Sequence, residues 1–240
     1  MEQLEGSERA MTRTYQLKRR AHQQDETRQR IVEAAVHLHE TLGPAHTSIT
    51  AIAEQAGVER LTVYRHFPDE QTLFTACTSH YLAANPLPEP ADWMQLADPE
   101  TRLRVALTEI YAYYQRTEHM QLNSARDLPD LPAMQRVLEP YFVYFKRVQD
   151  GLAEGWGTQG RLHERVCAVL AHALDFRTWY AFVREQSLSN DEVVALMVQF
   201  VRCIVSECER GMEPEPDNST GAHDAGAHPL DTSPQLSGEV

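Results

Sequence analysis

The sequence has no apolar run near the ~20 residues that a transmembrane helix needs, which argues against a membrane-spanning segment. The segment from Met1 to Met11 is acidic and polar, so it lacks the apolar core of a secretory signal. We therefore expect a cytoplasmic protein that does not contact a membrane.

Cysteine is scarce and not arranged for chemistry. Cys77, Cys167, Cys203 and Cys208 contain no CxxC pair and no metal-ligand spacing, so reduced and mostly buried thiols are expected. The common catalytic and phosphate-binding signatures, such as GxSxG, HExxH and a glycine-rich phosphate loop, are missing. We expect no cofactor, no metal site and no enzymatic activity, with a small helical enzyme as the alternative in another class.

The charge is strongly asymmetric along the chain. The formal net charge is −13, yet residues 9–30 contain seven basic and two acidic residues, or 7 − 2 = +5. Residues 81–240 contain 13 basic and 24 acidic residues, or 13 − 24 = −11. The basic N-terminal part can therefore attract phosphates despite the net negative charge.

Residues 48–67 have the pattern of two short helices joined by a tight turn. Apolar residues recur with helical spacing from Ile49 to Ala56, Ser48 can cap the first helix, and Gly57 is placed to end it. The second segment, Glu59–His66, has one apolar seam and a face of arginine, threonine and histidine. Such a helix is suited to the major groove of DNA.

The residues of this stretch resemble the helix-turn-helix of TetR/AcrR-type transcriptional regulators. The resemblance rests on Thr47-Ser48-Ile49, Ile52-Ala53, Ala56-Gly57-Val58 and Thr62-Val63-Tyr64-Arg65-His66-Phe67-Pro68, and covers about residues 25–83. It implies an all-α fold, with an N-terminal three-helix DNA-binding domain and a C-terminal helical effector and dimerisation domain.

The resemblance also implies DNA contacts. We expect phosphate contacts from Thr47, Ser48, Tyr64 and His66, and base contacts from Arg60, Leu61, Thr62 and Arg65. Three sites depart from the usual family pattern: Glu59 replaces a small N-cap, Leu61 a small residue, and Glu70 a phosphate-binding lysine. These departures affect which operator sequence is recognised.

Four segments are predicted. Residues 1–24 form a flexible basic arm, in which Lys18, Arg19 and Arg20 either contact DNA or belong to a solvated tail. The DNA-binding domain covers residues 25–84, and its first helix begins at Asp25, with His37 and His39 expected at the surface. Proline-rich residues 85–90 separate it from a helical ligand-binding and dimerisation domain at 91–210, and residues 211–240 read as a disordered tail.

The second domain is rich in aromatic residues and methionine, which suit an apolar ligand pocket, although for any one of them a place in the core is the better interpretation. The candidate ligand-binding residues are Trp93, Tyr111, Tyr114, Arg126, Met134, Phe142, Phe145, His172, Phe176 and Trp179.

The last two predicted helices, Leu162–Gln186 and Ser189–Arg210, are apolar around much of their circumference. A thick monomer core would explain this, whereas the resemblance implies a four-helix homodimer interface. The chain is thus expected to be a repressor released from a near-palindromic operator by an unknown small apolar or aromatic effector. The alternative regulator is controlled by a protein partner.

Overall fold

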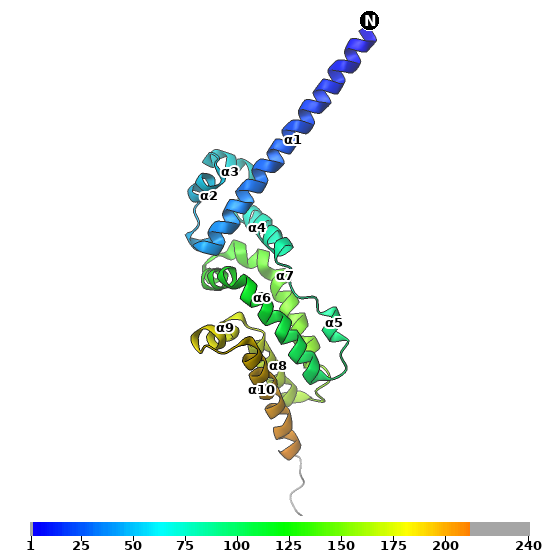
Figure 1. The fold of residues 1–240 in the computed structure, drawn as a ribbon, viewed down its shortest axis with the longest axis vertical. Coiled ribbons are helices and arrows are strands. Elements are labelled where there is room, and N and C mark those ends of the chain that lie inside the picture. Colours follow the sequence, from blue (N-terminus) through cyan, green and yellow to red (C-terminus); the bar gives the residue numbers. More distant parts are fainter. Residues whose placement is uncertain (1, 212–240) are drawn as a thin grey trace, which may run out of the picture.

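The computed structural model describes residues 2–211, and this range contains helices and loops but no strand. Figure 1 shows α1 projecting from one end of an elongated molecule and α10 at the other. The N-terminal elements are α1 (Glu2–Thr41), η1 (Pro44–His46), α2 (Ile49–Ala56), α3 (Arg60–His66) and α4 (Glu70–Ala84). The C-terminal elements are α5 (Ala91–Met94), α6 (Pro99–Asp127), η2 (Leu128–Asp130), α7 (Pro132–Ala153), α8 (Gly160–Ala173), α9 (Phe176–Tyr180), η3 (Ala181–Glu185) and α10 (Asn190–Gly211). The predicted all-α fold is confirmed.

The N-terminal domain packs α1 to α4 around one small core. Its most deeply buried side chains include Ile31 and Ala35 from α1, Ile52 from α2 and Val63 from α3. Phe67, which ends α3, is also buried. These are the residues whose helical spacing predicted the core, because apolar side chains three and four apart share one face of a helix.

The first helix begins far earlier than the sequence pattern indicates. It starts at Glu2 instead of Asp25, so most of the predicted arm continues α1 beyond the domain core. The segment lacks an apolar stripe, but it is rich in glutamine, arginine and glutamate, which favour helix without any packing. Residues 212–240, which hold nearly all of the predicted tail, lie outside the described residues.

The C-terminal domain packs around α6. Leu103, Leu107, Ile110, Tyr111 and Tyr114 point from α6 into a core shared with α7, α8, α9 and α10. The start of α10 has a capping box: the Ser189 backbone N–H donates to Glu192 Oε2 at 2.8 Å, and the Glu192 N–H donates to Ser189 Oγ at 3.3 Å. This box fixes where the final helix begins.

One predicted helix in this domain is wrong. The expected helix 162–186 is divided after Ala173, because the Asp175 carboxylate accepts from the Arg177 N–H and starts α9. The helix α6 is continuous up to Asp127, and α7 continues on both sides of Pro140.

No helix within the described residues is both long and apolar enough to cross a bilayer. In the same range, histidine, cysteine and carboxylate side chains do not gather into a metal-binding cluster. Cys77 is buried, Cys167 half-buried and Cys203 exposed, and all three are free thiols.

Candidate DNA-binding helix and inter-domain cavity

The helix α3 is anchored by apolar residues and presents its remaining side chains to solvent. Val63 and Phe67 are buried, whereas Arg60, Leu61, Tyr64 and Arg65 are exposed. Leu61 is the most exposed large apolar residue of the described chain, at 72%. An exposed leucine next to two arginines is what direct base readout uses, because arginine pairs with guanine and apolar groups contact the thymine methyl.

The turn before α3 has the predicted geometry. The Ser48 hydroxyl accepts from the Ala51 N–H at 3.1 Å, and Gly57 adopts left-handed φ and ψ of 65° and 42°. Glu59 makes no side-chain cap, as expected for a residue in place of a small N-cap. The tight turn holds α2 and α3 in a fixed relative orientation, as a helix-turn-helix requires.

The predicted phosphate-binding residues differ in their exposure and in whether their polar groups are already hydrogen-bonded. Thr47 donates its hydroxyl to the Gly43 carbonyl at 2.8 Å, so it must rotate before it can donate to a phosphate. Ser48 uses its oxygen as an acceptor and keeps its proton for another partner. Tyr64 is 45% exposed, and His66 is half-buried. Burial and the nearby Arg65 and Arg28 lower the His66 pKa, so its ring is mainly neutral at pH 7.

Arginines of the N-terminal domain also lie close to α3. The Arg28 guanidinium stacks over the Phe67 ring at 4.7 Å from its centroid, and Arg65 donates to the Thr62 hydroxyl at 3.2 Å. Lys18, Arg19 and Arg20 are exposed on the N-terminal extension of α1. The extension therefore presents these three cations from a helix, where an irregular arm was expected.

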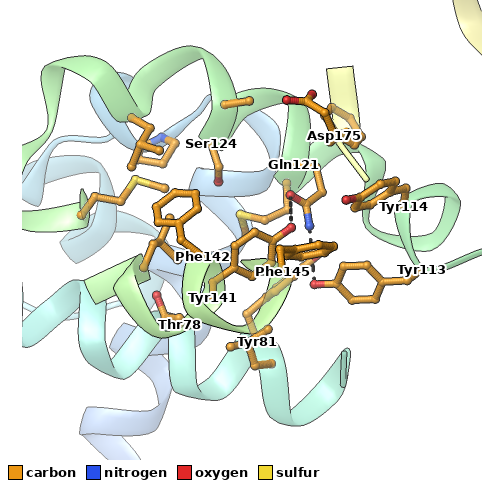
Figure 2. A pocket seen from close by; sticks show the side chains of 18 of the residues that line it. Thr78, Tyr81, Tyr113, Tyr114, Gln121, Ser124, Tyr141, Phe142, Phe145 and Asp175 are labelled. Atoms are coloured by element: carbon orange, nitrogen blue, oxygen red, sulfur yellow. Dashed lines mark hydrogen bonds between the residues drawn. The ribbon is translucent and has the colours of Figure 1, made fainter. Parts of the chain in front are cut away.

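A cavity of about 510 Å³ lies between the two domains. Its walls come from α1 and α4 on one side and from α6, α7 and α9 on the other, together with the loops beside them. The lining is mainly apolar and includes many aromatic side chains, and Figure 2 shows Phe142, Phe145, Tyr141 and Tyr114 around it. Such a volume and lining are typical of sites for small organic ligands.

Half of the predicted ligand-binding residues line this cavity: Tyr114, Met134, Phe142, Phe145 and Phe176. Trp93, Tyr111 and Trp179 instead belong to the core of the C-terminal domain, where their polar atoms are already bonded. His172 is exposed on α8, and Arg126 lies at the end of α6. Neither lines the cavity.

His39 is the main residue that the sequence pattern placed wrongly. It was expected at the surface, but it is only 5% exposed and lines the cavity from α1. Burial lowers its pKa to about 4, with a smaller opposing effect from the Asp127 carboxylate. Its position follows from α1 packing against α4 and α6, which a spacing of two residues from His37 cannot reveal.

Gln121 and two phenols form a bonded polar group inside the cavity. The Tyr141 hydroxyl donates to Gln121 Oε1 at 3.2 Å, and Gln121 Nε2 donates to the Tyr113 hydroxyl at 3.5 Å (Figure 2). None of the three was a sequence-based candidate. The polar groups of this side of the cavity satisfy one another.

The C-terminal end of α6 forms hydrogen bonds with the segment that precedes the helix-turn-helix. Asn123 donates to the Glu40 carbonyl at 2.7 Å, and Arg126 to the Leu42 carbonyl at 2.9 Å. The buried Asp127 carboxylate accepts from the Ala45 N–H at 3.0 Å and from Arg126. We call these contacts the α6 clamp. The Arg126 guanidinium holds the pKa of Asp127 below its usual range, so the clamp is ionised at neutral pH.

The described residues form an all-α chain with a helix-turn-helix, whose second helix is exposed, and a second helical domain. Residues 31–77 match the sequence profile of the family described as bacterial regulatory proteins, tetR family. The part of the chain that is similar to this family thus lies within the N-terminal domain.

One relative is similar to part of this chain in sequence, and two solved structures share its fold. The HTH-type transcriptional repressor NicS of Pseudomonas putida is 33% identical over 97 residues, a match that covers 40% of this chain and 46% of NicS. The match thus spans about half the length of that relative. HlyIIR, a hemolysin II transcriptional regulator, superposes with a TM-score of 0.54 at 20% identity, over 74% of this chain and 97% of that one. A transcriptional regulator of Rhodococcus sp. Rha1 gives 0.52 at 18% identity, over 79% and 99%.

Proposed function

We propose that this protein is a homodimeric transcriptional repressor that leaves its operator when a small apolar ligand occupies the inter-domain cavity. The observation that carries the DNA-binding part is the exposed face of α3, where Arg60, Leu61 and Arg65 face solvent while Val63 packs the helix against the core. Two such helices, related by a two-fold axis, fit a near-palindromic operator.

The two arginines of α3 test the DNA-binding part directly. We expect Arg60→Ala and Arg65→Ala each to weaken operator binding about tenfold, or about 1.4 kcal/mol, because each removes one base contact. The operator is first selected from random duplexes with the full chain, and affinities are then measured by fluorescence anisotropy. Arg136→Ala is the matched control, since Arg136 is exposed on α7 and bonds to Gln71. Wild-type affinity in both α3 variants would contradict the proposed role of α3.

Ligand control is supported by the position of the cavity. Gln121, Ser124 and Ala125 line it from α6, and the next residues of the same helix form the α6 clamp on the end of α1. A ligand that moves this part of α6 must move the segment just before Thr47. The ligand releases DNA only if it binds the released arrangement better than the bound one.

The dimer is proposed to form through α8 and α10. Leu196 and Phe200 are 42% and 51% exposed on α10, where they present an apolar surface without a covering element in the described chain. Val201 lies next to Phe200 but is fully buried within the subunit. A charge at Val201 would therefore unfold the subunit, so the exposed pair gives a cleaner test of assembly.

We expect Phe200→Glu to convert the dimer into a folded monomer, because a charge in the centre of a hydrophobic interface is left unpaired. Light scattering at micromolar concentration measures the mass, and circular dichroism checks that the helices remain. Leu122→Glu is the control, since Leu122 is 41% exposed but lies on α6. A monomeric wild type, or a dimeric Phe200→Glu variant, would refute this interface.

A further inference from the structure

Four uncharged polar groups of the cavity have no hydrogen bond within the described part of the chain. They are the imidazole of His39 from α1, the hydroxyls of Thr78 and Tyr81 from α4 and the hydroxyl of Ser124 from α6. His39 is the most buried of them, and its ring packs against Phe74, at 5.5 Å between centroids. Figure 2 shows the Thr78 and Ser124 hydroxyls directed into the cavity. No polar side-chain atom of the described residues is both fully buried and without a partner, so these groups are open to the cavity and can bond to a ligand there.

The other polar groups around the cavity already have partners. Gln121 bonds to Tyr113 and Tyr141, and Arg177 donates to the Ala125 carbonyl at 2.9 Å. At the rim, Lys146 pairs with Asp150, and the Asp175 carboxylate caps α9. Lys146 and Asp175 are thus engaged, whereas Arg177 bonds to a backbone carbonyl and not to a carboxylate. The uncharged groups without a partner come from α1, α4 and α6.

The imidazole of His39 is neutral at pH 7, because burial lowers its pKa to about 4. A neutral imidazole has one donor and one acceptor nitrogen, and each hydroxyl can both donate and accept. A hydroxyl group on a ligand matches such a set whichever tautomer is present. A carboxylate would require His39 to take up a proton in a buried site.

We propose that the cavity binds a neutral aromatic molecule with a hydroxyl group, which bonds to His39, Thr78 and Ser124 while its rings lie against Phe142 and Phe145. This inference rests on the proposed ligand control and names the chemistry of the ligand. The polar end of the ligand would then contact the DNA-binding domain itself through α1 and α4. Ligand binding would depend directly on how α1 and α4 pack against α6. The hydrogen bonds of the α6 clamp stabilise this packing.

Three probes with one ring system test the proposal: 2-naphthol, naphthalene and 2-naphthoate. Calorimetry on the full chain should show 2-naphthol binding about tenfold more tightly than naphthalene, the effect of about one net hydrogen bond to the cavity groups. 2-Naphthoate should bind most weakly. In His39→Phe, the affinity for 2-naphthol should fall to that for naphthalene, while naphthalene itself binds as before.

A second variant tests the same polar contacts if the substitution at position 39 impairs folding. Thr78→Val with Ser124→Ala keeps the shape of the cavity and should also reduce the preference for 2-naphthol. His37→Phe and Ser79→Ala, at exposed sites on the same two helices, should leave all three affinities unchanged. Equal binding of 2-naphthol and naphthalene, tightest binding of 2-naphthoate, or no binding of any probe would overturn the proposal.

Operator binding is measured on the same preparations. If wild type binds no duplex, the proposed function fails, whatever the probes do. If wild type binds its operator but shows no preference for 2-naphthol, only the ligand assignment fails. If 2-naphthol weakens operator binding, operator must weaken 2-naphthol binding by the same factor, because coupling between two sites is reciprocal.

Discussion

Replacing Gly43 by alanine should destabilise the protein by about 3 kcal/mol, through left-handed strain and overpacking together. Gly43 has a φ of 101°, and a Cβ there would overlap Arg126 Nη2 and Asp127 Oδ2. The substitution therefore forces the α6 clamp apart at the point where α6 meets the end of α1. Urea denaturation of the full chain measures the loss in the free energy of unfolding.

Gly157→Ala is the matched control for Gly43→Ala. Gly157 also has a left-handed φ, of 68°, but a Cβ there meets no atom within 4 Å. The Gly157→Ala substitution should therefore lower the free energy of unfolding only through backbone strain, by about 1 kcal/mol. If the two variants are equally stable, the close approach of α6 to Gly43 is not important for stability. A folded Gly43→Ala variant should also show reduced coupling between ligand and operator.

Lowering the pH from 7 to 5 should cost wild type about 2 kcal/mol of unfolding free energy that the His39→Gln variant does not lose. The pKa of His39 is lowered to about 4 in the folded state, from an ordinary 6.5. Between these values the unfolded chain binds a proton that the folded chain excludes, so stability falls as the pH falls from 6.5 towards 4. Above 6.5 both states are neutral and the effect disappears.

Measurement at pH 5 separates His39 from the carboxyl groups. Asp127 has a lowered pKa, so its contribution is present above its usual range and is lost only at more acidic pH. His37→Gln, at an exposed site two residues away, is the control and should retain the wild-type pH dependence. Parallel pH profiles for wild type and His39→Gln would show that the folded chain accepts a proton at His39 without penalty.

Local sequence signals predicted the helix-turn-helix well. Ser48 and Gly57 cap and end their helix as expected, because capping depends on the hydroxyl or the missing side chain of one residue near the helix end. The apolar spacing from Ile49 to Phe67 likewise predicted which side chains are buried. These features involve neighbours within about one helical turn, so they are visible in the order of residues.

Long-range packing decided the rest. Whether Trp179 or Phe145 faces a core or a cavity depends on how α7 and α9 lie against α6, and both residues look alike in a helical pattern. The same holds for the burial of His39, which requires α4 and α6 to cover one face of α1.

The order of residues therefore determined the all-α class, the helix-turn-helix and its exposed arginines, because these depend on local propensity and on amphipathic spacing. The tertiary structure alone decided that the cavity lies between the domains, that a histidine of the DNA-binding domain lines it, and that Asp127 clamps the loop before α2. Asp127 and Ala45 are far apart in the chain, and only the packing of α6 against α1 brings the carboxylate within 3.0 Å of that backbone N–H.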